Sequence, residues 1–261
     1  MSLDCLMKLS DLQDEYFFRL PHAKIIADYV WPGVIMGPQR VIDIKDIEFG
    51  ADDIVIASYP KSGTTGWLSW SLEWRLEVIL KLSRRFRRRA CSLKRQRSVV
   101  CLPSLIFLWV AAQVCAPGQV PIDLCCSQSK EDNAVSFYHF HRMSRFLGRQ
   151  KNLSWNDFFA LYLNGTLYCG SWFEHVLGYW KFAKGNDKVL FVKYEDLKQG
   201  LNSEVDKIAT KFLDFKLDDV QMAKVLQHTA FDSMKDNKMA NRDFWLSIRR
   251  FPSSCARVRY R

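Results

Sequence analysis

A change in hydrophobic period along residues 53–82 predicts a strand, a tight turn and a helix. Residues 53–58 form a short apolar run with β-branched side chains, which is typical of a buried strand. Pro60 and Gly63 then favour a turn. After this turn, large apolar side chains recur at helical spacing: Trp67, Trp70, Trp74 and Val78. We therefore expect a strand-to-helix connection in which residues 59–67 form the loop.

The second half of the chain predicts one further strand among several helices. Residues 189–194 are apolar on both faces, which is typical of a buried strand, and Ser154 is placed to cap a helix. Helical spacing extends over five stretches: 130–142, 154–162, 172–180, 201–212 and 218–227. Strands and helices in this order predict an α/β fold with a parallel sheet covered by helices on both faces.

Two stretches lack a clear period. Residues 1–50 are expected to be an irregular leading segment that lies over the core. Within residues 83–128, the segment 99–112 is apolar on every side but contains Pro103, which disfavours a helix. Its fourteen residues are also short of the roughly twenty needed to cross a bilayer, so no membrane segment is expected. We expect residues 83–128 to contain no regular element, which would leave the strand at 53–58 without a central neighbour.

Length and composition favour one α/β domain over residues 1–261, although two small domains would also fit 261 residues with 48% hydrophobic content. The net charge of +10 comes from two stretches, residues 84–97 and 249–261, which hold 13 of the 38 Lys and Arg residues. Six of the eight Cys lie in or beside these stretches. We therefore expect segments 83–128 and 249–261 to be aberrant, through an altered reading frame or exon use, or an erroneous gene model.

The first residues lack a basic region followed by an apolar stretch, so we expect a cytoplasmic protein with free thiols. The sequons at Asn152 and Asn164 are then expected to be ordinary loop or helix residues. The cysteines of residues 83–128 show no Cys-x-x-Cys pair, which argues against zinc. His139 and His141 point to different faces of a helix, so no metal is expected there.

The loop at 59–67, Tyr-Pro-Lys-Ser-Gly-Thr-Thr-Gly-Trp, combines groups that bind a phosphate-like anion. Gly63 lets the backbone approach closely, Lys61 supplies charge, and the helix N-terminus directs its free N–H groups to the same place. Hydroxyl donors come from Ser62, Thr64 and Thr65. The loop differs from the nucleoside-triphosphatase form, because no Gly-Lys-Ser/Thr string is present. An ordinary turn is the alternative, since Ser, Thr and Gly are common turn residues.

Five blocks of sequence resemble, in the same order, those of the cytosolic sulfotransferases, which transfer a sulfuryl group from 3′-phosphoadenosine 5′-phosphosulfate to a hydroxyl or amine. The blocks are Tyr59-Pro-Lys-Ser-Gly-Thr-Thr65, Ala134-Val-Ser-Phe-Tyr-His-Phe140, Gly170-Ser-Trp-Phe-Glu-His-Val176, Tyr194-Glu-Asp-Leu-Lys198, and Thr229-Ala-Phe-Asp-Ser-Met234 before Asn237-Lys-Met-Ala-Asn241. Together they cover residues 50–82 and 130–248. The resemblance implies a three-layer α/β fold with a central parallel sheet and a P-loop-like phosphosulfate-binding loop.

The resemblance also implies roles for the matching positions. Lys61 is the catalytic position, because it stabilises charge on the bridging oxygen as the S–O bond breaks, which suits a transfer that needs positioning more than covalent help. Ser136 holds the 3′-phosphate and restrains that lysine, or simply caps a helix. The 5′-phosphosulfate is held by Lys61, Ser62, Gly63, Thr64 and Thr65. The adenine pocket is Trp67, Tyr194, Thr229, Phe231 and Met234, with core packing as the alternative for the aromatic members.

The sequence departs from the family pattern at four places. The family's catalytic base is a histidine between the loop and the 3′-phosphate serine, but no histidine occurs between His22 and His139. The family's arginine eight residues before that serine is Gln128 here, and Gly66 separates the loop's last threonine from Trp67. After Phe251 the Arg-Lys-Gly clamp on the 3′-phosphate and the dimerisation string are absent. Loss of a general base costs roughly 10²- to 10⁴-fold in rate, so we expect impaired activity.

These observations predict a sulfotransferase that uses 3′-phosphoadenosine 5′-phosphosulfate and no metal, with a small-molecule phenol, alcohol or amine as acceptor. A catalytically inactive nucleotide-binding or interaction protein on the same scaffold is the first alternative. An RNA or membrane binder acting through residues 84–97 is the second, and it predicts salt-dependent association. We expect neither nucleic acid nor membrane as a partner, because the charge outside the two basic stretches is slightly acidic.

Overall fold

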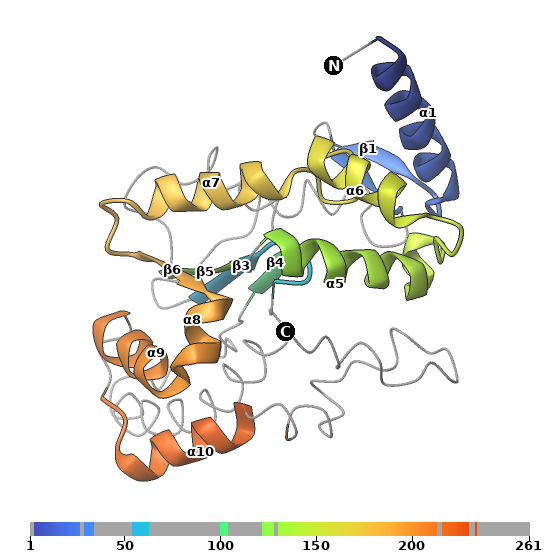
Figure 1. The fold of residues 1–261 in the computed structure, drawn as a ribbon. Coiled ribbons are helices and arrows are strands. Elements are labelled where there is room, and N and C mark those ends of the chain that lie inside the picture. The colour runs from blue at the N-terminus through green and yellow to red at the C-terminus, as the bar shows by residue number, and fades with distance from the viewer. Residues whose placement is uncertain are drawn as a thin grey trace, which may run out of the picture.

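The computed structural model describes residues 3–26, 29–33, 54–62, 100–103, 122–127, 130–212, 216–229 and 233. A four-stranded sheet lies at the centre of this part of the chain (Figure 1). Its strands are β3 (Ile54–Ser58), β4 (Val100–Pro103), β5 (Ile122–Ser127) and β6 (Val189–Lys193). Their order is β4-β3-β5-β6, and each neighbouring pair is parallel. The α/β class predicted from the sequence is confirmed.

The parallel register brings the carboxyl ends of the strands to one edge of the sheet. Ser58 pairs with Cys126 across β3 and β5, and Ser127 pairs with Lys193 across β5 and β6. The segments that follow β3, β5 and β6 therefore leave from the same edge. In open parallel sheets this edge is where ligands bind.

Two of these strands lie inside residues 83–128, where no regular element was expected. The prediction of a missing central strand is wrong, because β5 fills the position between β3 and β6. A short apolar run does not by itself distinguish a strand from a buried helix. Pro103 is compatible with β4, because it is the last residue of a strand that has only one neighbour in the described sheet.

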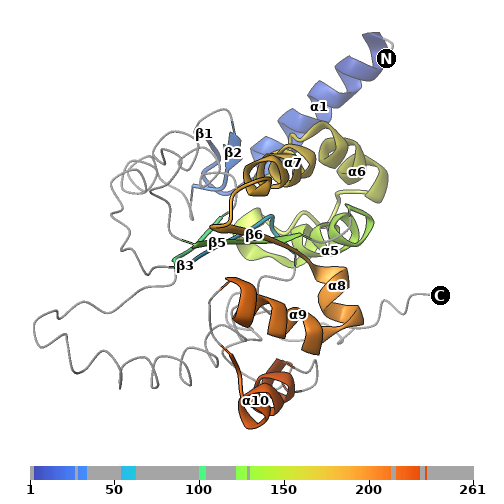
Figure 2. The same ribbon diagram turned by 90° about the vertical axis from the view of Figure 1, so that its left-hand side faces the viewer.

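Helices flank the sheet on two sides. In both views α6 (Trp155–Asn164) and α7 (Trp172–Ala183) lie above it (Figures 1 and 2). Below it lie α8 (Tyr194–Gln199), α9 (Leu201–Lys207) with its π-helical continuation Ile208–Phe212, and α10 (Asp219–Thr229). Helix α5 (Lys130–Met143) follows β5 directly. The predicted cap of α6 is confirmed, since the Ser154 side chain accepts a hydrogen bond from the Asp157 N–H.

The chain begins with a helix rather than the irregular segment expected from its sequence. Helix α1 spans Leu3–Arg19, and the short antiparallel strands β1 (Lys24–Ile26) and β2 (Tyr29–Trp31) follow. Leu9, Leu12 and Tyr16 recur at helical spacing and face the core. This spacing is a local signal that could have predicted α1. It was missed because residues 1–50 were interpreted as one segment, and their later part is rich in Pro and Gly.

A buried polar chain ties α1 to the rest of the core. The Tyr16 hydroxyl, on a side chain 2% exposed, donates to His141 Nε2 at 2.8 Å and accepts the Tyr168 N–H at 3.1 Å. His141 Nδ1 lies 2.9 Å from the Phe137 carbonyl oxygen, which can only accept, so Nδ1 carries the imidazole proton. The Tyr16 hydroxyl is therefore the shared partner of His141 Nε2 and the Tyr168 N–H.

Replacing Tyr16 with phenylalanine is expected to lower the free energy of unfolding by about 2 to 3 kcal/mol. The change leaves His141 Nε2 and the Tyr168 N–H buried without partners, and each orphaned group costs about 1 to 3 kcal/mol. Urea denaturation measures the effect. Tyr138→Phe is the matched control. Its half-buried hydroxyl makes two long bonds, to the Leu153 carbonyl at 3.3 Å and from the exposed Arg142 at 3.4 Å, so a loss below about 1 kcal/mol is expected. Equal losses in both variants would contradict the assignment.

Candidate functional site

A tight turn follows β3 at the carboxyl edge of the sheet. The Ser62 N–H donates to the Tyr59 carbonyl oxygen at 3.1 Å, which closes a four-residue turn with Pro60 in its second position. Lys61, in the third position, has φ of +67°. Glycine is the usual residue there, because a side chain is strained in the left-handed region. Lys61 holds this conformation although nothing in its own chemistry favours it.

The Lys61 side chain extends from the turn toward α5. Its Nζ lies 5.0 Å from the centre of the Phe140 ring, a cation–π distance, and the residue is partly exposed. The ammonium group is therefore placed at the sheet edge, on an aromatic surface, where an incoming anion can reach it. This is the position at which the sequence predicted the catalytic lysine.

Asn133 of α5 contacts the turn on both sides of Lys61. Its Nδ2 donates to the Pro60 carbonyl oxygen at 2.8 Å and to Ser62 Oγ at 3.1 Å. Its Oδ1 accepts from the Tyr162 hydroxyl of α6 at 3.1 Å. Asn133 and Ser62 are both 0% exposed, so these bonds are made away from water. The turn is thus attached to two helices through one amide.

Tyr59 anchors the beginning of the turn in the core. Its hydroxyl donates to the Gly170 carbonyl oxygen at 2.8 Å, and the side chain is 1% exposed. Its ring lies against those of Phe137 and His175, with centroids 5.7 and 5.8 Å away. Two of the sequence blocks, at 59–65 and 170–176, therefore meet directly in space.

Ser136 and Tyr194 reach the same edge of the sheet from other elements. Ser136 stands one turn after Asn133 and one turn before Phe140, so helical spacing puts it on the side of α5 that faces the loop. Tyr194 begins α8 immediately after β6, and Lys198 Nζ lies 5.7 Å from its ring centre. Four predicted site residues thus lie on segments that follow strands of the sheet at its carboxyl edge: Lys61, Ser62, Ser136 and Tyr194.

The structure describes the remaining predicted site residues only in part. Thr229 is the last residue of α10, and only its backbone is described. Six others lie outside the described residues: Gly63, Thr64, Thr65, Trp67, Phe231 and Met234. The same holds for Gln128 and Phe251, next to which the sequence departs from the family pattern.

The described residues at this edge are better suited to bind an anionic group than to act as a general base. Lys61 supplies charge, Ser62 stands next to it in the turn, and Ser136 lies on α5, the helix whose Asn133 contacts this turn. His141 and His175 are buried, and burial lowers their pKa to about 4 and about 3. His141 Nε2 is already bonded to Tyr16, and His139 is exposed on α5. Neither of the two buried histidines, His141 and His175, is therefore suited to replace the missing base.

Sequence reasoning did not single out Asn133, Tyr162 or Phe140. Phe140 belonged to a quoted block, but no role was attached to it. The only available signal for Asn133 was its place in a helix, one turn before Ser136. An amide that is buried in a helix usually makes hydrogen bonds to particular polar groups. Its partners come from residues 73, 71 and 29 positions away, which no local pattern reveals.

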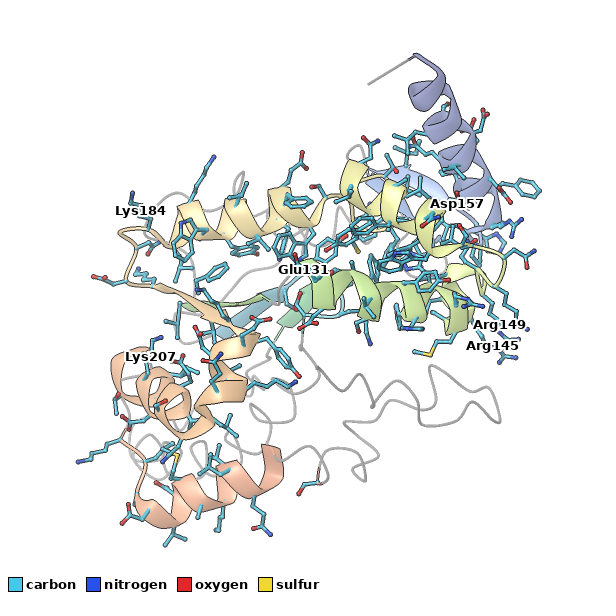
Figure 3. All side chains as sticks on the ribbon, in the orientation of Figure 1. Glu131, Arg145, Arg149, Asp157, Lys184 and Lys207 are labelled. Carbon is cyan, nitrogen blue, oxygen red and sulfur yellow. The ribbon has the colours of Figure 1, made fainter. Side chains whose placement is uncertain are left out.

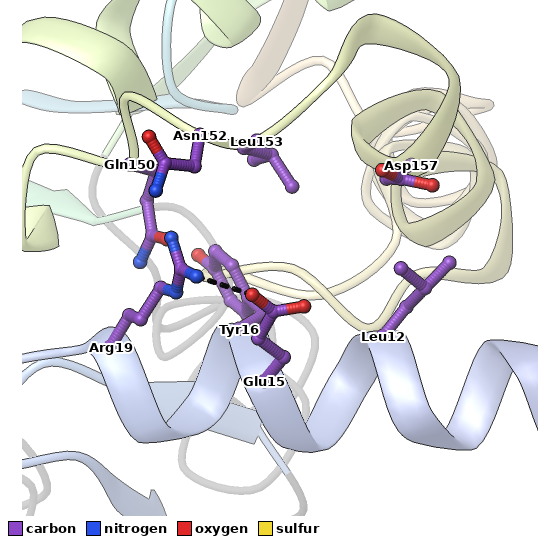
Figure 4. Close-up of a pocket in the computed structure, with 8 residues that line it drawn as sticks. All are labelled: Leu12, Glu15, Tyr16, Arg19, Gln150, Asn152, Leu153 and Asp157. Atoms are coloured by element: carbon purple, nitrogen blue, oxygen red, sulfur yellow. Dashed lines mark hydrogen bonds and ion pairs between the residues drawn. The ribbon is translucent and has the colours of Figure 1, made fainter.

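Two other features of the described part lie away from this edge. Figure 3 shows Arg145 and Arg149 at the end of α5 opposite Glu131, so these cations are not at the turn. A cleft between α1 and residues 150–157 encloses about 30 Å³, enough for one or two water molecules (Figure 4). The ion pair of Arg19 with Glu15 lines it, together with Leu12, Tyr16, Gln150, Asn152, Leu153 and Asp157. The cleft is too small for a phenol or a steroid.

Within the described ranges, no helix is long and apolar enough to cross a membrane. Those ranges also contain no group of three His, Cys, Asp or Glu residues suited to a metal ion. Cys169 is buried and free.

Comparisons with known proteins agree on one family. The model of the sulfotransferase domain matches residues 124–258. Sulfotransferase 1C2 of Oryctolagus cuniculus is 30% identical over 226 residues, which cover 76% of this chain and 71% of that protein. Sulfotransferase 1B1 of Canis lupus familiaris is 31% identical over 220 residues, with the same coverage of 76% and 71%.

Solved structures show the same likeness. The crystal structure of mouse sulfotransferase SULT7A1 complexed with PAP aligns with a TM-score of 0.64 at 26% identity and covers 83% of this chain and 76% of that one. Retinol dehydratase, solved with androsterone and inactive cofactor PAP, aligns with a TM-score of 0.62 at 19% identity, covers 87% of this chain and 80% of its own, and supports the shared fold.

Proposed function

Because the chain belongs to the sulfotransferase family, we propose that it transfers a sulfuryl group from 3′-phosphoadenosine 5′-phosphosulfate to a hydroxyl or amine of a small acceptor. The observation that carries this proposal is the turn after β3, which directs Lys61 out at the carboxyl edge of a parallel sheet. The mouse relative of similar fold was solved with PAP. Phenols, alcohols and amines are the acceptor classes we propose.

The residues of the turn and of α5 would hold the donor. Lys61 would bind the 5′-phosphosulfate and stabilise charge on the bridging oxygen, with Ser62, Gly63, Thr64 and Thr65 as further donors on the P-loop-like loop. Ser136 would bind the 3′-phosphate. The adenine would lie against Trp67, Tyr194, Thr229, Phe231 and Met234. When bound, the donor supplies the sulfuryl group, while the chain contributes position and charge.

We further propose that activity is impaired and that the acceptor must lose its proton without a histidine base. Both buried histidines near the turn have lowered pKa values because of desolvation, and neither ring is exposed. A catalytically inactive nucleotide-binding protein is the second candidate, favoured by the same observation. We propose a cytoplasmic protein with one domain over residues 1–261 in which segments 83–128 and 249–261 are aberrant. No metal enters the proposed reaction.

Calorimetry with 3′-phosphoadenosine 5′-phosphate, together with transfer from radiolabelled donor to 1-naphthol and 2-phenylethylamine, tests the proposal. Binding with slow transfer is expected, at a rate roughly 10²- to 10⁴-fold below an enzyme that has its base. Binding without transfer would favour the inactive protein. Absence of binding, together with salt-dependent association with RNA or anionic vesicles, would instead favour the basic stretch at residues 84–97 as the functional element.

A further inference from the structure

We infer that Asn133 is the positioning residue of the proposed phosphosulfate-binding turn, and that it acts by holding the backbone on both sides of Lys61. This inference rests on the proposed function. Asn133 does not touch the reacting groups. It acts through the conformation of the residue that does.

The contacts of Asn133 bracket one residue. Its two Nδ2 hydrogens go to the Pro60 carbonyl oxygen at 2.8 Å and to Ser62 Oγ at 3.1 Å. The Pro60 carbonyl can only accept, so the atom beside it must be the nitrogen, and this fixes the orientation of the amide. The Tyr162 hydroxyl then meets the Oδ1 atom at 3.1 Å. Every polar atom of the Asn133 side chain is therefore used.

The bracketed residue is the one that needs support. Lys61 has φ of +67°, in the left-handed region that residues with a side chain rarely adopt. Such a conformation persists only when surrounding contacts determine it. The hydrogen bond between the Ser62 N–H and the Tyr59 carbonyl closes the turn from within, and Asn133 holds it from α5.

The same contacts determine how Ser62 meets an anion. Because Ser62 Oγ accepts from Asn133, the amide fixes the position of this hydroxyl next to Lys61. A negatively charged group needs donors, so the amide prepares both the lysine and the serine for one ligand. Burial of Asn133 and Ser62, each 0% exposed, protects the arrangement from exchange with water.

Asn133→Leu, Asn133→Asp and Tyr162→Phe test this inference. Leucine removes all three bonds at nearly constant size, while aspartate keeps the acceptor for Tyr162 and loses both donors to the turn. Tyr162→Phe removes the hydrogen bond to Asn133 Oδ1 and leaves both bonds from the amide to the turn in place. His139→Ala, an exposed change on the same helix, is the matched control. Thermal melting of each variant establishes that it is folded.

We expect Asn133→Leu and Asn133→Asp to weaken binding of 3′-phosphoadenosine 5′-phosphate about tenfold and to lower kcat about 10- to 100-fold. Tyr162→Phe should change each by less than about threefold, since only the support of the amide is lost. A second readout needs no ligand. Trypsin should cleave after Lys61 about tenfold faster in the Asn133 variants, because the turn opens more often, while cleavage after the exposed Lys184 stays unchanged.

The inference would be overturned if folded Asn133→Leu and Asn133→Asp behaved like the unmodified chain. In that case their nucleotide affinity, their kcat and their rate of cleavage after Lys61 would all lie within about twofold of its values. If the unmodified chain binds no 3′-phosphoadenosine 5′-phosphate, the proposed function is wrong, and the ratio of cleavage after Lys61 to cleavage after Lys184 still decides the role of Asn133. Faster cleavage at both lysines would indicate general loosening and would also overturn it.

Discussion

Replacing Lys61 with alanine is expected to lower sulfuryl transfer by about 10²- to 10³-fold, the usual cost of removing one group that stabilises charge in a transition state. The ammonium group lies at the carboxyl edge of the sheet, 5.0 Å from the Phe140 ring centre. Initial rates with radiolabelled donor and 1-naphthol measure the loss. Lys184→Ala changes an exposed lysine at the C-cap of α7, and this control should leave the rate unchanged.

Lys61→Gly separates the charge of this residue from its backbone conformation. Glycine adopts a φ of +67° without steric cost. The free energy of unfolding of this variant should therefore be about 0.5 to 1 kcal/mol higher than that of Lys61→Ala. Both variants should be equally slow in transfer, because both lack the ammonium group. Urea denaturation gives the difference. If Lys61→Ala transfers at the rate of the unmodified chain, the lysine is not the catalytic group, whatever the stabilities show.

Acidification is expected to destabilise the fold steeply, by about 4 kcal/mol between pH 7.5 and pH 5. Burial lowers the pKa of His141 to about 4 and that of His175 to about 3, below the ordinary 6.5. Below pH 6.5 the unfolded chain therefore binds two protons that the folded chain does not. The contribution of these histidines is fully present above pH 6.5 and is lost as the pH falls toward 4. Urea denaturation at intervals of half a pH unit measures the slope.

His175→Phe tests how much of this dependence of the free energy of unfolding on pH comes from His175. No described residue makes a hydrogen bond to either ring nitrogen of His175, and the ring packs against Tyr179 at 5.0 Å between centroids. Phenylalanine keeps the ring contact and removes two buried polar atoms, so stability at pH 7.5 should be unchanged or higher by about 1 kcal/mol. The acid slope should fall by about half. An unchanged slope would mean that His175 is protonated in the folded chain.

The sequence predicted the elements whose signals are local. The cap at Ser154 needs only the hydroxyl and an N–H three residues later, and strand β6 needs only its own apolar run. Where a local pattern was ambiguous, the prediction was wrong. Residues 100–103 and 122–127 become strands because β3 offers hydrogen-bonding partners on both sides, a reason that lies outside their own sequence.

The sequence by itself determined the chemistry that this chain can bring to its site: a lysine and hydroxyls on a loop after a strand, and no histidine between His22 and His139. The tertiary structure alone decided what holds that lysine. The amide of Asn133 reaches the turn from α5, and Tyr162 meets the same amide from α6. Such contacts are set by packing between elements distant along the chain, because hydrogen bonds act over about 3 Å in space and not along the sequence.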